Sequence, residues 1–280
     1  MLKIAADIES ALKKAGVRNA RQESRWILSA LTGLAPAEIP LHSKYVLSYE
    51  QMAQSQGMLE KRCSGMPLSR VLGAQNFMGL EFKLNRDTLD PRIDTEILVE
   101  QVLKDSAAET EATLLDLGTG SGCIALAILS SRPNFKGLGV DKSEAALKQA
   151  GANARHHGLE DRFALLCADW SSCLSGKFDY IVSNPPYIRH RDITNLDTEV
   201  RKYDPILALD GGNDGLESIR QIIFSLKNLL SKAGKAFLEI GYDQRDEVAR
   251  LIEKSGFQLY DVHPDSTGIP RVVEISNGDK

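Results

Sequence analysis

The stretch Leu114-Leu-Asp-Leu-Gly-Thr-Gly-Ser-Gly-Cys-Ile-Ala-Leu-Ala127 indicates the fold class of this 280-residue chain. An apolar strand runs into a turn with three glycines, and an apolar helix follows at once. Glycines remove side chains where the chain turns tightly, and they let a ligand approach the backbone. The sequence therefore predicts a ligand-binding loop that comprises Gly118, Thr119, Gly120, Ser121 and Gly122.

The spacing of these glycines separates the loop from two common nucleotide motifs. A dinucleotide fingerprint, Gly-x-Gly-x-x-Gly, would have its third glycine at position 123, which is Cys123. The Gly-Lys-Ser/Thr ending of a phosphate loop is absent too. Asp141, which ends the next predicted strand, lies 21 residues after Gly120. A carboxylate there accepts hydrogen bonds from both hydroxyls of a ribose and repels a phosphate on that ribose.

The stretch Cys167-Ala-Asp-Trp170 follows the third predicted strand. Asp169 offers a hydrogen-bonding group and Trp170 an aromatic face, and together they suit an adenine. An adenosine-bearing ligand that requires no pyrophosphate is S-adenosylmethionine, which we predict as the cofactor. The alternative is a glycine turn beside an aspartate that merely caps a helix.

The sequence around this stretch alternates between predicted strands and helices from about residue 86 onward. This alternation is typical of a parallel sheet covered by helices on both faces. About eight residues join the last two strands, too few for a helical crossover, so the last strand should be antiparallel. We predict an α/β fold with a mostly parallel seven-stranded sheet, whose strands are residues 113–117, 136–140, 163–167, 180–183, 236–240, 258–262 and 271–276.

The first 75 residues have a different pattern. Apolar residues recur at three- or four-residue steps, as on helices, and a third helix is expected over residues 49–63. This segment has ten Lys/Arg and six Asp/Glu, whereas the remainder has 24 and 32. We predict a helical domain over residues 1–75 that recognises the substrate, a hairpin connector over 76–85 and a catalytic domain over 86–280. The two apolar faces comprise Ile4, Ile8, Leu12 and Ala15, and Trp26, Ile27, Ala30 and Leu31.

A second chemical motif, Asn184-Pro-Pro-Tyr187, follows the fourth predicted strand, at the sheet edge where ligands bind. Pro185 and Pro186 have no backbone donors, so Asn184 and nearby carbonyls form an acceptor-rich wall. Such a wall suits a planar NH₂ group. It would align a weakly nucleophilic nitrogen and stabilise the charge that develops on it, and Tyr187 could pack on its flat face. The alternative is a proline-rich turn capped by Asn184.

Composition excludes several classes of protein. A net charge of −4 does not fit nonspecific nucleic-acid binding. No apolar run approaches the roughly 18–20 residues of a membrane span, and the N-terminus lacks a signal region. The four cysteines form no Cys-x-x-Cys pair, so we expect reduced thiols, no metal site and a cytoplasmic protein.

Taken together, the motifs resemble those of the release-factor glutamine methyltransferases (the HemK/PrmC family), over nearly the whole chain. Two motifs match, Asp116-Leu-Gly-Thr-Gly-Ser-Gly122 and Asn184-Pro-Pro-Tyr187. Further similar stretches are Pro67-Leu-Ser-Arg-Val-Leu-Gly73, Leu89-Asp-Pro-Arg-Ile-Asp-Thr-Glu96 and the segment over residues 203–216. The family typically has Pro-Arg-Pro-Glu-Thr-Glu, preceded by an apolar residue, and this chain departs from that pattern at Asp90, Ile93 and Asp94.

The resemblance implies a class I (Rossmann-like) S-adenosylmethionine-dependent methyltransferase. Its implied reaction is N5-methylation of the glutamine in the Gly-Gly-Gln loop of peptide-chain release factors. The donor would be held by the glycine loop, Asp141 and Trp170, and the substrate amide by Asn184. Pro185, Pro186 and Tyr187 would shape the pocket, and the helical domain would engage the release factor.

Other interpretations remain open on the sequence. The same motif serves ribosomal-protein glutamine methyltransferases and DNA adenine methyltransferases. A regulator that binds the donor without catalysis and a dinucleotide-dependent oxidoreductase belong to other classes. We interpret Arg189 and Arg191 as a solvated edge and residues 210–215 as a flexible loop before a helix. No general base is assigned to the scattered His42, His156, His157, His190 and His263.

Overall fold

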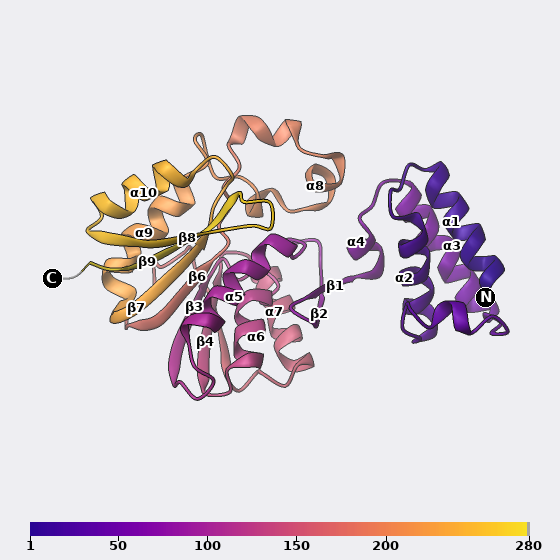
Figure 1. Cartoon of the computed structure of the whole chain (residues 1–280), viewed down its shortest axis with the longest axis horizontal. Coiled ribbons are helices and arrows are strands. Elements are labelled where there is room, and N and C mark those ends of the chain that lie inside the picture. Colours follow the sequence, from indigo (N-terminus) through magenta and orange to yellow (C-terminus); the bar gives the residue numbers. More distant parts are fainter. Residues whose placement is uncertain (279–280) are drawn as a thin grey trace. The chain divides into compact units, whose positions relative to one another are not determined.

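The computed structural model describes residues 1–278, which form two compact units. The first unit comprises residues 1–74 and 197–203 and is built from helices. Its core contains Leu12, Ile27 and Leu28, which are fully buried. Its helices (Figure 1) are α1 (Leu2–Lys14), α2 (Ala20–Thr32), η1 (Ile39–Leu41), α3 (Tyr49–Cys63), α4 (Leu68–Leu72) and α8 (Thr198–Tyr203).

The buried face of α2 differs from the predicted one. Ala30 is exposed, whereas Ala20 and Ser24 are buried beside Ile27 and Leu28. The buried residues recur at steps of four, three and one, which is the stripe of a helix packed on one side. The prediction selected the neighbouring stripe because Trp26 and Ala30 are apolar, but Trp26 is only half-buried.

A buried arginine connects three helices of this unit. Arg62 on α3 pairs with Glu23 on α2 at 2.6 Å and with Glu199 on α8 at 2.9 Å. Its guanidinium also donates to the carbonyl of Met66 at 3.1 Å. Because a buried charge needs such partners, these bonds explain why α8, distant in sequence, clusters with the helical unit.

A two-stranded sheet follows, formed by β1 (Ala74–Phe77) and β2 (Leu80–Lys83). Met78 and Gly79 both have positive φ, at 51° and 76°. This conformation is required by a type I′ turn between antiparallel strands. The rings of Phe77 and Phe82 then meet edge to face, with centroids 6.2 Å apart.

The second unit contains a seven-stranded sheet in the order β5-β4-β3-β6-β7-β9-β8. β9 runs antiparallel to both neighbours and the other neighbouring pairs are parallel, which confirms the predicted sheet. The prediction placed the start of β7 several residues too late. The strands are β3 (Ala112–Leu117), β4 (Phe135–Asp141), β5 (Phe163–Cys167), β6 (Phe178–Ser183), β7 (Leu230–Glu239), β8 (Phe257–Pro264) and β9 (Pro270–Asn277).

Helices cover both faces of this sheet (Figure 1). Successive strand residues alternate between two apolar clusters: Leu114 belongs to the first and Leu115 to the second, and both are fully buried. The first cluster includes α5 (Glu96–Asp105), α6 (Cys123–Ser131) and α7 (Glu144–His156). The second includes α9 (Glu217–Leu229) and α10 (Arg245–Lys254). Short 3₁₀ helices complete the unit: η2 (Ile93–Thr95), η3 (His190–Asn195) and η4 (Ile206–Ala208).

The order of the strands locates a binding crevice. From β3 the chain moves outward to β4 and β5, and it then returns to pair β6 with the other edge of β3. Ligands of open α/β sheets bind at the carboxyl ends of strands where the order reverses. A ligand site is therefore expected where β3, β4 and β6 end. Among the described residues, no helix has the length and apolar character to cross a membrane.

Candidate active site

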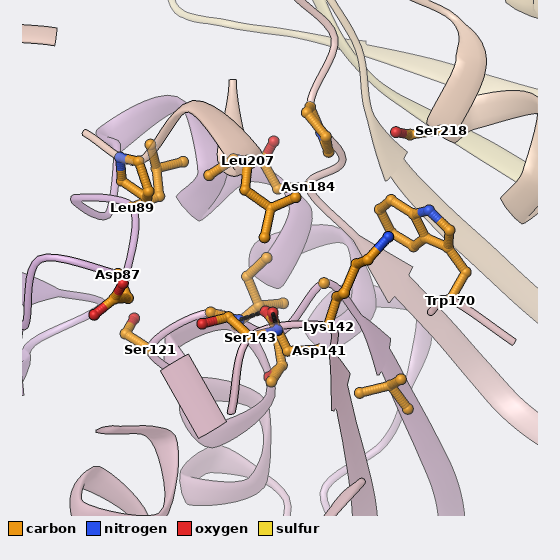
Figure 2. A pocket seen from close by; sticks show the side chains of 18 of the residues that line it. Asp87, Leu89, Ser121, Asp141, Lys142, Ser143, Trp170, Asn184, Leu207 and Ser218 are labelled. Carbon is orange, nitrogen blue, oxygen red and sulfur yellow. Dashed lines mark hydrogen bonds between the residues drawn. The ribbon is translucent and has the colours of Figure 1, made fainter. Parts of the chain in front are cut away.

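A cavity of about 260 Å³ lies at this switch point. Residues that end different strands face it, and Figure 2 shows Asp141, Trp170 and Asn184 around the same space. The sequence-predicted residues that line it are Gly118, Thr119, Gly120, Ser121, Asp141, Asp169, Trp170, Asn184 and Pro186.

The glycine loop leaves β3 in a left-handed conformation. Gly118, Gly120 and Gly122 have φ values of 74°, 55° and 82°, which L side chains rarely adopt. A Cβ on Gly122 would also lie 3.1 Å from the side chain of Leu126 on α6. Gly122 does not line the cavity. Its lack of a side chain instead allows α6 to begin close to the loop.

A buried carboxylate holds the middle of the loop. The Thr119 hydroxyl donates to Asp116 Oδ2 at 2.7 Å, and the backbone N–H groups of Gly118 and Thr119 both donate to the Val140 carbonyl. Complete burial raises the pKa of Asp116 to about 7. These bonds anchor the loop to β3 and β4 on both sides.

Asp141 ends β4 and is fixed by two backbone donors. Its Oδ2 accepts from Gly120 N at 2.9 Å, and its Oδ1 accepts from Ser143 N at 2.8 Å. Burial raises the pKa of this carboxyl above its ordinary value. An ionised carboxylate oxygen has two lone pairs, so each oxygen retains one for a ligand hydroxyl.

Trp170 follows β5 and forms one wall of the cavity (Figure 2). Its backbone has a positive φ of 50°, uncommon for a large side chain. A Cβ built on Gly118 would lie 3.4 Å from the indole ring, so the absence of a side chain there gives the ring its room. The neighbouring Asp169 is half-exposed and pairs with Lys142 Nζ at 3.1 Å.

Asn184 directly follows β6, and its Nδ2 donates to Thr95 Oγ1 at 3.0 Å. The next residues of the motif diverge: Pro186 lines the cavity, whereas Pro185 and Tyr187 do not. Tyr187 packs against the second apolar cluster, and its hydroxyl donates to Glu239 Oε1 at 3.2 Å. The expectation that Tyr187 packs on the flat face of an acceptor stays a prediction, and the structure adds that its hydroxyl bonds the buried Glu239.

Two residues of this region were missed in the sequence. Thr95 lines the cavity, and its hydroxyl donates to the buried Glu239 at 2.6 Å. Burial raises the pKa of Glu239 to about 7. The available signal was the acid itself: Glu239 interrupts the apolar run Ala236-Phe-Leu-Glu-Ile240 at the carboxyl end of a strand. Charged residues are rarely buried without partners.

The loop over residues 210–215 is packed, so its interpretation as flexible was wrong. Gly211 N donates to the Ile188 carbonyl at 2.8 Å, and His190 N donates to the Gly212 carbonyl at 2.9 Å. Gln244 Nε2 bridges the carbonyls of Tyr187 and Gly215, at 3.0 Å each. The glycines permit close backbone approach, and the loop fixes the end of the Asn-Pro-Pro-Tyr motif.

We expect Gly215→Ala to destabilise the unit. Its φ is 79°, and an added Cβ would lie 2.5 Å from the Tyr187 carbonyl oxygen. Gly268→Ala is the matched control, because its φ of 86° imposes the same strain with no atom within 4 Å. Thermal melting should place Gly215→Ala at least about 3 °C below the control. Equal melting temperatures would show that the 210–215 loop accommodates the added Cβ with no loss of stability.

The remaining candidate residues lie outside the cavity. None of the five histidines lines it, and Arg189 instead pairs with Asp243 at 2.7 Å. Ile93 is 80% exposed, and Asp94 lies 3.4 Å from Arg271. Within residues 1–278, no cluster of His, Cys, Asp and Glu is arranged to hold a metal ion.

Comparisons with known proteins agree with this geometry. The family model "Methyltransferase small domain" matches residues 85–201, and "PrmC N-terminal domain" matches residues 4–73. A protein of Agrobacterium fabrum named release factor glutamine methyltransferase is 38% identical, covering 96% of each chain. A protein of the same name from Rhodospirillum rubrum is 41% identical over 93% of this chain and 80% of its own length.

Solved structures resemble the fold at lower identity. The catalytic domain of hMettl16 superimposes with a TM-score of 0.57 at 16% identity, covering 83% of this chain and 84% of that one. A ribosomal protein L11 methylase from Lactobacillus delbrueckii subsp. bulgaricus gives 0.52 at 21% identity, covering 67% and 81%. These likenesses show the Rossmann-like methyltransferase fold and nothing about the acceptor.

Proposed function

Because the chain belongs to the release factor glutamine methyltransferases, we propose that it methylates peptide-chain release factors. The reaction moves a methyl group from S-adenosylmethionine to the side-chain amide nitrogen (N5) of the glutamine in a Gly-Gly-Gln motif. The observation that carries the proposal is that Asp141, Trp170 and Asn184 line one cavity at the switch point of the sheet.

The residues that line the cavity would hold the adenosine part of S-adenosylmethionine. Each Asp141 oxygen has a lone pair for one ribose hydroxyl, and the Trp170 ring offers a face for the adenine. Asp169 would accept from the adenine amino group, and the loop over residues 118–122 would hold the remainder. When bound, this cofactor supplies a methyl group on positively charged sulfur.

On the acceptor side, the task of the chain is to orient a poor nucleophile. The lone pair of an amide nitrogen is delocalised, so the nitrogen must be aligned and its developing charge stabilised. Asn184 Oδ1 would accept one hydrogen of the glutamine NH₂ group, and a backbone carbonyl of the motif the other. Pro185 and Pro186 add no competing backbone donor. The product amide loses its proton to solvent, so no general base is required.

The helical unit is proposed to engage the release factor. Three of its residues are strongly exposed although they are large and apolar, and each could contact a partner. They are Leu41, Val46 and Tyr49, at 79%, 86% and 91% exposure. The net charge of +4 over residues 1–75 would favour an acidic partner surface. Release factors act in the cytoplasm, so we propose that compartment for the enzyme.

The acceptor can be identified by competition between substrates. The purified chain is incubated with S-adenosylmethionine labelled in its methyl group, together with unmethylated release factor, ribosomal proteins and DNA. We expect the label in the release factor. Label found only in ribosomal proteins or DNA would show that one of these, and not the release factor, is the substrate. Binding of the donor without transfer to any of them would indicate a regulator. A copurified nicotinamide, seen by its ultraviolet absorbance, would indicate an oxidoreductase.

A further inference from the structure

A run of hydrogen bonds connects the acceptor residue to the interior. Asn184 Nδ2 donates to Thr95 Oγ1 at 3.0 Å, and Thr95 Oγ1 donates to Glu239 Oε2 at 2.6 Å. Tyr187 Oη donates to the other oxygen of the same carboxylate at 3.2 Å. Thr95 and Glu239 are each 2% exposed. The bonds therefore join η2, β7 and both ends of the Asn-Pro-Pro-Tyr motif, and they are shielded from water.

The direction of each bond follows from the available protons. An ionised carboxylate only accepts, so the single hydroxyl proton of Thr95 goes to Glu239. The Thr95 oxygen then offers Asn184 only lone pairs, which accept from Nδ2 and repel Oδ1. The Asn184 amide is held with its nitrogen against Thr95, and Oδ1 is the atom left to accept.

We propose that Thr95 and Glu239 are positioning residues, which fix the Asn184 amide in the orientation that offers its oxygen to the acceptor. This inference rests on the proposed function. A flipped Asn184 amide would direct its N–H donors at the NH₂ group of the substrate glutamine, which is itself a hydrogen-bond donor. Neither Thr95 nor Glu239 needs to touch the reacting atoms, because each acts through Asn184.

The test separates the Thr95 hydroxyl from the shape of the side chain. Thr95→Val retains the branched shape and removes the hydroxyl, whereas Thr95→Ser retains the hydroxyl. We expect Thr95→Val to lower kcat at least tenfold while the Kd for S-adenosylmethionine stays within about twofold, and Thr95→Ser to recover most of kcat. Thr113→Val is the matched control, because the Thr113 hydroxyl bonds Asp179 at an exposed position near the amino ends of β3 and β6, and neither residue lines the cavity.

A second readout does not depend on the acceptor. In ¹⁵N-labelled protein, the Asn184 side-chain NH₂ resonances are identified by their loss in Asn184→Ala. We expect their hydrogen exchange to accelerate in Thr95→Val and to return toward the original rate in Thr95→Ser. Unchanged exchange in Thr95→Val, or a kcat within twofold of the original, would overturn the proposal. If no release factor is methylated at all, the exchange experiment still decides the role of Thr95.

Glu239 gives the inference a pH signature. The charged groups that face it are Asp94, which raises its pKa, and Arg271, which lowers it; burial dominates and brings the pKa to about 7. Above that pH the carboxylate accepts from both Thr95 and Tyr187. Below it the acid carries its own proton, and one hydroxyl loses its acceptor. The pKa of the Tyr187 hydroxyl is itself raised by burial, so this group remains a donor throughout.

We therefore expect kcat to rise between about pH 6 and about pH 8 in the original enzyme. Glu239→Gln has nearly the same shape and cannot ionise, so it should have a lower kcat and lack this rise. The measurement is kcat at saturating substrates across the range. A rise of equal size in Glu239→Gln would exclude Glu239 as its source and overturn its positioning role.

Discussion

Asn184→Ala is expected to lower kcat for release-factor methylation by at least about a hundredfold, the cost of losing one well-placed polar group at a reacting centre. Asn184 lines the cavity, and its Nδ2 donates to Thr95 Oγ1 at 3.0 Å, so Oδ1 is the atom proposed to accept from the glutamine amide. Alanine removes Oδ1, so nothing aligns the nitrogen of the substrate glutamine with the methyl donor. The Kd for S-adenosylmethionine should stay within about twofold, because Asp141 and Trp170 are untouched.

The measurement combines single-turnover kinetics with calorimetry of donor binding, and retained binding also reports that the variant is folded. Asn134→Ala is the matched control, since the Asn134 side chain donates to the Glu109 carbonyl at 3.1 Å at an exposed position. Its kcat should equal that of the original enzyme. If Asn184→Ala turned over within about threefold of the control, the acceptor role of Asn184 would be untenable.

Asp141→Ala has the second large expected effect, on the donor. A hydrogen bond to a charged group contributes roughly 1.5–3 kcal/mol, so we expect the Kd for S-adenosylmethionine to rise about tenfold to a hundredfold. The variant also loses the bonds from Gly120 N and Ser143 N, at 2.9 and 2.8 Å, which order the loop. The loss of affinity therefore combines missing ligand contacts with a less ordered site.

Two further variants separate those contributions in calorimetry. Asp141→Asn retains the shape and one acceptor oxygen, so its Kd should lie between those of the original enzyme and Asp141→Ala. Asp169 lines the same cavity, but its carboxylate is half-exposed and paired with Lys142. Asp169→Ala should therefore raise the Kd for S-adenosylmethionine less than Asp141→Ala does. A Kd for Asp141→Ala within twofold of that of the original enzyme, with an unchanged melting temperature, would refute the role of Asp141 in binding the donor.

Much of the fold was accessible from the sequence because local signals determine it. The short connection between β8 and β9 forced an antiparallel last strand, and β9 pairs antiparallel with β7. The glycine loop and Asp141 followed from the spacing of a strand, a turn and a helix. These signals depend on residues that are close together along the chain.

The parts that could not be predicted depend on tertiary contacts. Thr95 and Glu239 are 144 residues apart, and no local pattern reports that their side chains meet. The glycines over residues 210–215 suggested flexibility, but Gly211 and Gly215 instead permit close backbone contact. Tyr187 is expected beside the acceptor because aromatic rings stack, but no local pattern indicates that its hydroxyl bonds Glu239, 52 residues away.

The most direct test of the proposed reaction is to locate the transferred methyl group. Purified, unmethylated release factor is incubated with this protein and S-adenosylmethionine, and its peptides are sequenced by tandem mass spectrometry. We expect a mass gain of one methyl group on the glutamine of the Gly-Gly-Gln peptide, absent with Asn184→Ala. An unmodified peptide in the presence of an enzyme that binds the donor, or a methyl group on another residue, would contradict it.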